Sequence, residues 1–222
     1  MRIERIVDLS RPIGSQTVVY PGDPPVRLRR VATIERDGFN VLDVGLGSQS
    51  GTHVDAPYHC RAGAARIDEV PLQRFIGPGV VIDARGRRPR EPIGSDALEP
   101  YEADLRPGAI AVLHTGWAEH YGTDAYFDHP YLHREACERL LARGVTTILV
   151  DAPSPDETPD GDHPGEGYPC HRLVAAAGGV VGENLCGLER IDWPDPLISV
   201  LPIRLEAADS APVRAVALRM TL

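Results

Sequence analysis

The order of the apolar segments in the middle of the chain constrains the fold most. Ala109–Thr115 (AIAVLHT) is a short continuous apolar run typical of a buried strand, and Val145–Val150 (VTTILV) is a second one. Between them, Leu132–Arg143 has an apolar stripe at helical spacing, and Gly144 follows as a helix stop. The succession of strand, helix and strand predicts an α/β fold built on a mixed sheet.

Further periodic segments surround this unit, and the length of 222 residues fits one domain spanning residues 1–222. Helices are expected at Ser95–Leu105 and His171–Ala177. Strands are expected at Arg2–Leu9, Val26–Ile34, Asn40–Leu46, Gly79–Ala84, Pro196–Leu205 and Val213–Met220.

Composition excludes several classes of function. The net charge of −9 disfavours nucleic-acid binding, because phosphate recognition needs a positive surface. The chain contains no lysine, which excludes Schiff-base catalysis, a lysine base and a P-loop. No apolar run approaches the roughly 18 residues of a membrane span, and the amino-terminal residues do not resemble a signal peptide. A cytoplasmic protein with four reduced cysteines is expected.

One long segment lacks any periodicity. Ala152–Pro169 is rich in proline, glycine and acidic residues. A loop of this length in a compact domain is usually functional or disordered. Two interpretations remain open, a solvated surface excursion and a flap or oligomer arm beside a site.

Three side chains that can bind metal lie within seven residues, at His53, Asp55 and His59. Gly51 and Pro57 disfavour a helix through them. In an extended segment His53 and Asp55 project to one side, and an imidazole beside a carboxylate is a common pair of ligands for Zn²⁺ or Mn²⁺. The alternative from spacing alone is a polar loop with surface histidines.

A second pair of candidates lies downstream. His171 begins the expected helix, and Glu183 follows the short apolar run at residues 179–182. A helix, a Gly-Gly turn and a strand would turn the chain back, so both side chains can face one pocket. The residues alone favour the simpler interpretation, a helix-cap histidine and a surface glutamate.

The run Gln49–His59 (QSGTHVDAPYH) resembles the HxGTHxDxPxH signature of the cyclase-like metal hydrolases, a family that includes bacterial kynurenine formamidases and isatin hydrolase. The resemblance extends over nearly the whole chain, and its weaker motifs occur in the family's order. These are YPGD at residues 20–23, HTGW at 114–117, DAPS at 151–154, ENL at 183–185 and DSAPVRAV at 209–216.

This resemblance implies a fold and roles for individual residues. It implies a mixed β-sheet closing into a barrel-like core with flanking helices, and a homodimer or higher homo-oligomer. His53 and Asp55 would hold a first divalent ion, Zn or Mn. Asp55 and Glu183 would bridge to a second ion completed by His171. By the same resemblance, His59 is the catalytic acid and base and Tyr20 packs on the substrate.

Gln49 departs from the family pattern, in which a metal-binding histidine occupies its position. Its amide oxygen can still be a ligand, but a neutral amide is a weaker donor than imidazole, which lowers the affinity for Zn²⁺, makes Mn²⁺ more competitive and allows for one ion instead of two. The function expected is hydrolysis of an amide, lactam or ester of a small carbonyl substrate by metal-activated water. The alternatives are a metal-dependent isomerase or lyase of the same fold, and a non-catalytic metal or small-molecule binder.

Other polar residues have less defined roles. Trp117 is expected in the core rather than in a pocket wall. Asp151 either orients a metal-binding histidine or caps the end of a strand. Four histidines are expected to be solvated, and these are His120, His129, His133 and His163.

Overall fold

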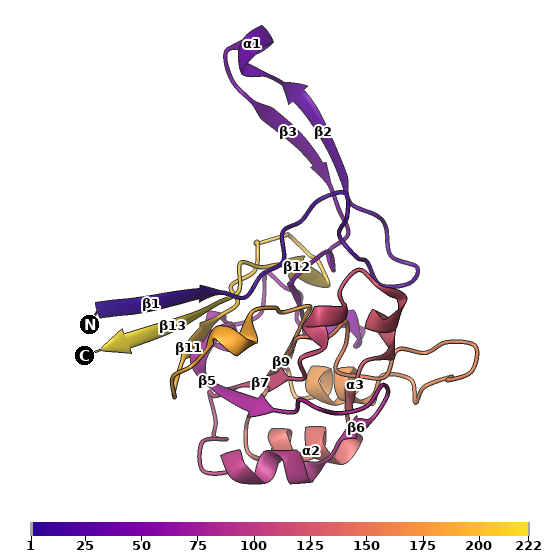
Figure 1. The fold of residues 1–222 in the computed structure, drawn as a ribbon, viewed down its shortest axis with the longest axis vertical. Coiled ribbons are helices and arrows are strands. Elements are labelled where there is room, and N and C mark those ends of the chain that lie inside the picture. The colour runs from indigo at the N-terminus through magenta and orange to yellow at the C-terminus, as the bar shows by residue number, and fades with distance from the viewer. Residues whose placement is uncertain (1, 222) are drawn as a thin grey trace.

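The computed structural model describes residues 2–221, and a nine-stranded mixed sheet runs through its body (Figure 1). Four neighbouring parallel strands form its centre. They are β5 (Ile76–Asp83), β7 (Ile110–His114), β9 (Thr147–Val150) and β10 (Val180–Glu183). Helix α2 (Arg134–Ala142) connects β7 to β9, as the succession of strand, helix and strand predicts.

Antiparallel strands extend this centre on both sides. The order across the sheet is β1-β13-β11-β5-β7-β9-β10-β4-β12. The added strands are β1 (Arg2–Asp8), β4 (His53–Asp55), β11 (Leu197–Ser199), β12 (Ser210–Pro212) and β13 (Val216–Thr221). No pairing between β1 and β12 closes the sheet within residues 2–221, so the α/β fold with a mixed sheet is confirmed but closure into a barrel is not.

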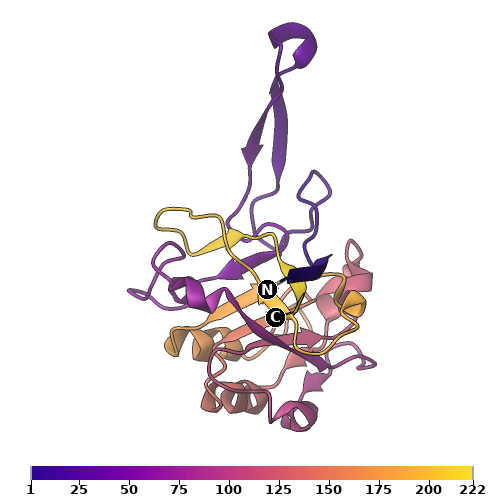
Figure 2. The same ribbon diagram turned by 90° about the vertical axis from the view of Figure 1, so that its left-hand side faces the viewer.

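Two apolar clusters cover the two faces of the central strands. Ala111 and Leu113 of β7 face one cluster, which contains side chains of α2 and α3 (Pro169–Ala176). Ile110 and Val112 face the other, which contains side chains of the outer strands β1, β11 and β13. Alternate residues of a strand point to opposite faces, so a strand buried on both faces is continuously apolar. Figure 2 shows α2 at the end of the body that lies farthest from the extended hairpin.

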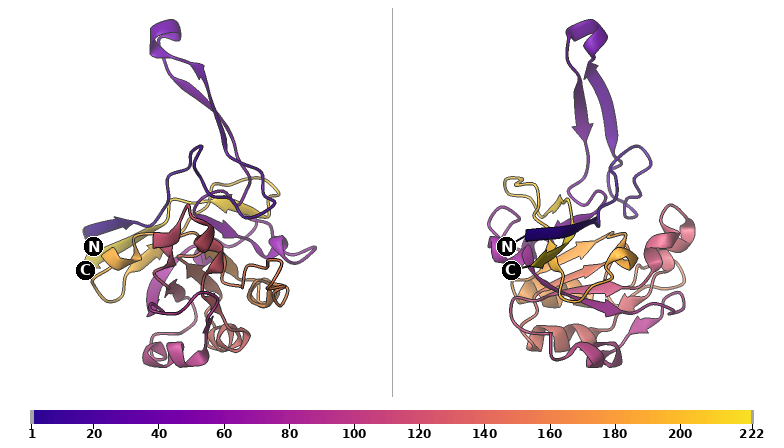
Figure 3. Two further views of the ribbon diagram at one scale, coloured as in Figure 1. Left: turned by 45° about the vertical axis from the view of Figure 1, so that its right-hand side comes forward. Right: turned by 60° about the vertical axis from the view of Figure 1, so that its left-hand side comes forward.

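A hairpin arm projects from this body. It consists of β2 (Arg27–Ala32), the short helix α1 (Ile34–Asp37) and β3 (Val41–Gly45). Figures 1 and 3 show it standing away from the sheet. All but one residue of the two strands is exposed. The strands expected at Val26–Ile34 and Asn40–Leu46 therefore form, but they bury no apolar face within the chain.

Several predicted elements differ in extent. Ser95–Leu105 forms not an α-helix but the 3₁₀-helix η3 (Ser95–Tyr101), and Pro100 inside it cannot donate a helical hydrogen bond. Of the strand expected at Pro196–Leu205, Leu197–Ser199 forms a strand, and Pro202 makes an isolated antiparallel bridge to Val213. The remaining short elements are β6 (Pro92–Ile93), β8 (Tyr131–Leu132), and the 3₁₀-helices η1 (Pro57–His59), η2 (Leu72–Arg74), η4 (Trp117–His120), η5 (Asp124–Asp128) and η6 (Leu188–Arg190). None of the helices in residues 2–221 has the length and apolar character needed to cross a membrane.

Candidate metal centre

The pairing of two antiparallel strands brings three of the predicted side chains to one face of the sheet. The register of β4 and β10 sets His53 opposite Glu183. Opposite residues project to the same face, and Asp55 joins them because the side-chain period of a strand is two. His53 Nε2 lies 3.3 Å from Glu183 Oε2 and 3.7 Å from Asp55 Oδ1.

The orientation of the His53 ring depends on the turn before β4. His53 Nδ1 donates to the carbonyl oxygen of Gly51 at 2.9 Å, when Nδ1 carries the proton. Gly51 has φ of +69°, a conformation that glycine adopts without the steric cost of a Cβ atom. With Nδ1 engaged there, Nε2 is directed at the carboxylates of Asp55 and Glu183.

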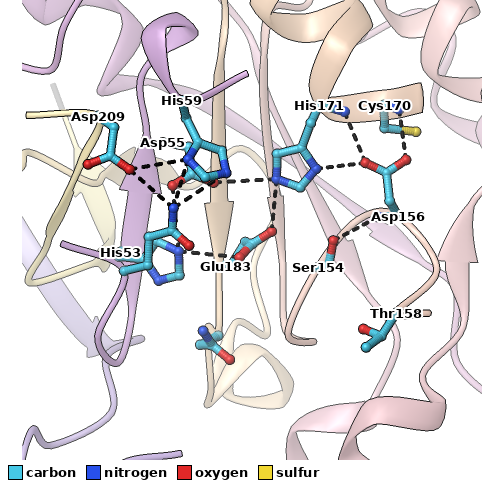
Figure 4. A network of polar contacts seen from close by, with 12 residues as sticks. His53, Asp55, His59, Ser154, Asp156, Thr158, Cys170, His171, Glu183 and Asp209 are labelled. Atoms are coloured by element: carbon cyan, nitrogen blue, oxygen red, sulfur yellow. Dashed lines mark hydrogen bonds and ion pairs between the residues drawn. The ribbon is translucent and has the colours of Figure 1, made fainter. Parts of the chain in front are cut away.

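Helix α3 supplies the fourth member, His171. Both oxygens of Asp156 cap the first turn of α3, because they accept from the backbone N–H groups of Cys170 at 2.7 Å and His171 at 3.0 Å. Asp156 Oδ2 also accepts from His171 Nδ1 at 2.6 Å (Figure 4). His171 Nε2 then lies 3.2 Å from Glu183 Oε1 and 3.4 Å from Asp55 Oδ2.

The pairwise contacts among these four side chains form a closed ring. The carboxylates of Asp55 and Glu183 each face both His53 and His171, and all four side chains are at least nine-tenths buried. Among residues 2–221, His53 Nε2, Asp55 Oδ1 and Glu183 Oε1 are buried without a hydrogen-bond partner. Each such atom costs about 1–3 kcal/mol when left unsatisfied. A divalent cation would satisfy all three, and imidazole with carboxylate suits Zn²⁺ and Mn²⁺.

The charges in this ring favour a cation. Burial lowers the pKa of His53, but the close contact with the Glu183 carboxylate and the charge of Asp55 outweigh burial and raise that pKa to about 9. For His171, Asp156 and the two ring carboxylates likewise overcome burial and hold its pKa well above the ordinary value. Protons therefore occupy the histidines when no ion is bound. A metal ion must displace them, so its binding releases protons.

His59 lies on the other side of Asp55, at the end of η1. Ligand atoms of Asp55, His59 and His171 come within 4.8 Å of one another, as do those of His53, Asp55 and Glu183. Asp55 is thus shared by two groups that can hold an ion. His59 Nδ1 faces Asp209 Oδ2 at 3.2 Å. Burial lowers the pKa of His59, but the hydrogen bond to Asp209 outweighs it and raises that pKa to about 10.

A cavity of about 270 Å³ opens onto both groups. Tyr20 and Tyr168 contribute aromatic surface to its wall. The Tyr20 ring also packs edge-on against Phe127, with centroids 6.2 Å apart. The remaining lining residues are Asp23, Gln49, Asp55, His59, Cys60, Ser154, His171 and Glu183.

All seven residues predicted for the site lie in this region. His53, Asp55, His171 and Glu183 form the ring, whereas His59, Gln49 and Tyr20 line the cavity beside it. His171 and Glu183 are buried, so the simpler interpretation of a helix cap and a surface glutamate is wrong.

The sequence did not predict the roles of two carboxylates. Asp156, which holds His171, comes from the aperiodic loop Ala152–Pro169, and Asp209, which holds His59, precedes β12. Neither has a local sequence pattern that identifies its partner. The loop is not simply a solvated excursion, because Ser154, Asp156 and Thr158 are buried.

The other polar residues have structural roles. Asp151 accepts from the backbone N–H groups of Thr115 and Gly116 and so caps the end of β7. Trp117 is buried in the apolar core, as expected. His129 is buried and pairs with Thr158, so its predicted solvation is wrong. All four cysteines are free thiols.

Comparison with known protein families and sequences gives consistent matches. The model of the Cyclase family matches residues 7–157. A kynurenine formamidase of Bordetella pertussis is 33% identical over 215 residues, which cover 96% of this chain and 98% of that protein. A kynurenine formamidase of Bacillus cytotoxicus is 27% identical over 218 residues, with coverage of 97% and 98%.

Solved structures share the fold. An isatin hydrolase bound to the product analogue thioisatinate superposes with a TM-score of 0.86 at 23% identity, covering 97% of this chain and 92% of that chain. Isatin hydrolase A from Ralstonia solanacearum gives a TM-score of 0.87 at 24% identity, with the same coverage.

Proposed function

The chain belongs to the Cyclase family, and on that premise we propose that it is a metal-dependent hydrolase of a small carbonyl substrate. The bond cleaved is an amide-type C–N bond or an ester bond. The observation that carries this proposal is the ring of four buried side chains, in which His53, Asp55 and Glu183 can offer ligand atoms within 4.8 Å of one another and each has a buried atom without a hydrogen-bond partner. The names of the relatives, formamidase and hydrolase, support cleavage by water.

The proposed ligands are His53, Asp55, His171 and Glu183, and the amide oxygen of Gln49 is a weaker fifth donor. The set of nitrogen and oxygen donors contains no thiolate and fits Zn²⁺ or Mn²⁺. The two groups that share Asp55 leave room for one ion or two.

A divalent ion bound there supplies an activated water and polarises the substrate carbonyl. His59 lines the same cavity and is proposed to take a proton from the attacking water and return it to the leaving group. Its raised pKa of about 10 describes the protein without an ion. A cation bound nearby would lower this pKa by charge repulsion, toward the range in which a histidine both accepts and donates protons.

The cavity limits the substrate to a small molecule, since about 270 Å³ lies just below the usual range for ligand pockets. Tyr20 and Tyr168 offer aromatic surface for a flat or ring-bearing group, and the carboxylate of Asp23 adds polarity. An aromatic amide, lactam or ester of this size fits that lining.

Metal analysis and a substrate panel test the proposal together. Protein purified without added metal should contain a stoichiometric divalent ion, and turnover of small formamides, lactams or esters in ¹⁸O-water should place the label in the product. Chelation should abolish turnover, and Zn²⁺ or Mn²⁺ should restore it. Turnover without label would indicate an isomerase or lyase. Tightly bound metal without turnover on the whole panel would indicate a binder.

We further propose that the hairpin arm packs on a second copy of this chain. Its exposed apolar residues include Phe39, Leu42 and Val44. An isolated two-stranded ribbon is marginally stable in water, so such an arm gains stability by packing on another surface. The elements β2, α1 and β3 contain four arginines and three acidic residues, so their net charge is +1. The chain as a whole has a net charge of −9. Light scattering should give a dimer or higher oligomer. A monomer at micromolar concentration would contradict this.

A further inference from the structure

Asp209 lies where two segments distant in sequence meet beside the candidate metal strand. Its backbone oxygen accepts from Ala56 N–H at 2.9 Å, and the next residue, Ser210, pairs with Asp55. The pairing of β12 with β4 therefore fixes the Asp209 backbone relative to the strand that carries His53 and Asp55. β12 lies on the side of β4 opposite to β10.

Both carboxylate oxygens of Asp209 have partners. Oδ1 accepts from Ser48 Oγ at 2.9 Å. Oδ2 faces two nitrogens, His59 Nδ1 at 3.2 Å and Gln49 Nε2 at 3.3 Å (Figure 4 shows the His59 contact). A carboxylate only accepts, so both nitrogens can donate to it at the same time.

Gln49 also approaches the His59 ring directly, so Asp209 and Gln49 compete for Nδ1. The Gln49 amide nitrogen lies 2.8 Å from Nδ1 and 3.4 Å from Nε2. A donor aligned with the Nδ1 lone pair would lie much farther from Nε2, because the lone pair points out of the ring. The similar distances therefore place the amide nitrogen off both lone-pair directions, so its alignment with either ring nitrogen is poor. Asp209 contacts Nδ1 alone.

We propose that Asp209 is a positioning residue that holds the proton of His59 on Nδ1 and leaves the Nε2 lone pair to exchange protons in the cavity. A hydrogen bond to a carboxylate is roughly twice as strong as one between neutral groups, which favours donation from Nδ1 to Asp209 over acceptance from Gln49. This inference rests on the proposed function, in which His59 is the acid and base.

The same carboxylate orients Gln49. When the side-chain NH₂ group of Gln49 donates to Asp209 Oδ2, the side-chain carbonyl oxygen of Gln49 points away from Asp209. Gln49 lines the cavity together with Asp55 and Glu183, so this orientation offers an oxygen rather than an N–H to a cation. One aspartate thereby sets both the tautomer of His59 and the orientation of the Gln49 amide.

The test compares Asp209→Asn with wild type by ¹⁵N NMR of the histidine side chains, with His59→Ala to assign the signals. The neutral form of His59 in wild type should carry its proton on Nδ1. In Asp209→Asn that proton should shift to Nε2, because the asparagine amide can donate to Nδ1. In a Ser-His-Asp triad the matching change costs about 10⁴-fold in kcat through the wrong tautomer. Here kcat should fall about 10²–10⁴-fold, with metal content and KM retained.

Ser48→Ala is the matched control. It removes the partner of Oδ1 and leaves the contact with His59, so kcat should fall by about fivefold or less. The inference is overturned if neutral His59 in wild type carries its proton on Nε2. It is also overturned if Asp209→Asn retains the wild-type kcat, or if that variant loses the metal. The tautomer is read in wild-type protein without ion or substrate, at a pH above the His59 pKa of about 10, where the ring is neutral. This measurement tests the inference even if Asp209→Asn does not fold. If wild type hydrolyses no substrate, that result counts against the proposed function and not against this inference.

Discussion

Two histidine–aspartate pairs flank Asp55, and they differ in what surrounds them. His171 Nδ1 donates to Asp156 at 2.6 Å, and the His171 and Asp156 side chains are 8% and 1% exposed. His59 Nδ1 faces Asp209 at 3.2 Å, and those side chains are 29% and 36% exposed. Asp156 is fixed by two backbone N–H groups of α3, whereas Asp209 is held by the side chains of Ser48 and Gln49.

Under the proposed function, the difference suits the two pairs to different tasks. A metal ligand must hold its lone pair in one direction, which a buried pair tied to a helix terminus achieves. A group that exchanges protons must reach substrate and solvent, which a half-exposed pair at the cavity permits. On this comparison the His171 pair fits a ligand, and the His59 pair fits an acid and base.

The largest expected effect comes from the residue that both pairs share. Asp55→Ala should remove bound metal and reduce turnover to background, because Asp55 belongs to both groups of potential ligands. Elemental analysis and a rate assay measure the two effects. Asp23→Asn, which changes a carboxylate of the cavity outside the ring, should keep the metal. A stoichiometric ion in Asp55→Ala would refute the site.

Replacing the two histidines separately tests the comparison directly. His59→Ala should keep the metal and lose at least about 100-fold in rate, because general acid–base catalysis is worth about 10²–10⁴-fold. His171→Ala should lose the metal. If both variants lose it, His59 is also a ligand and the division between the two pairs is wrong.

Replacing Asp156 tests whether the His171 pair orients a metal ligand. Asp156→Asn should lower metal affinity about 10–100-fold, as loss of a carboxylate partner behind a ligating histidine does. Competition with a chromophoric chelator measures that affinity. Asp162→Asn changes an exposed residue of the same loop and should leave the affinity unchanged. Equal affinities in the two variants would show that Asp156 does not orient a ligand.

The smallest effect concerns the pH dependence of stability in metal-free protein. The folded pKa of His59 is raised to about 10, so the stability from its pair with Asp209 should be complete below the unfolded value of about 6.5 and be lost as pH rises through about 10. The pKa of Asp209 is lowered, chiefly by its hydrogen bond with His59, so the same stability should also be lost in acid.

Urea unfolding of wild type and Asp209→Asn across pH measures this contribution. Because the pair is partly exposed, the difference should be about 0.2–1 kcal/mol near pH 5–6 and should vanish above pH 10. A difference that grows with pH in the alkaline range would contradict the assignment.

Local patterns predicted the central elements and part of the site. The apolar runs at β7 and β9 and the helix between them appear as expected, because hydrophobic periodicity depends only on neighbours in sequence. The shared face of His53 and Asp55 also follows from the period of a strand. The resemblance of Gln49–His59 to the cyclase signature identified the family, which the comparisons confirm.

Other features depend on partners that no local pattern specifies. The 3₁₀ form of Ser95–Tyr101 and the short pairing of Leu197–Ser199 reflect packing and register instead of propensity. The burial of His129 follows from its contact with Thr158, a residue of the aperiodic loop. The sequence of the hairpin arm resembles that of any pair of strands, and only the three-dimensional structure shows that the arm projects from the body.

The sequence by itself determined the α/β alternation, the family and the face that His53 and Asp55 share, since each is written in residues close together in the chain. Tertiary structure alone decided that Glu183 meets His53, because a shift of one residue in the pairing of β4 and β10 would turn Glu183 to the opposite face. The tertiary structure likewise decided which aspartate pairs with which histidine. Asp209 and His59 are 150 positions apart, and contacts of that span are set by how whole strands and helices pack.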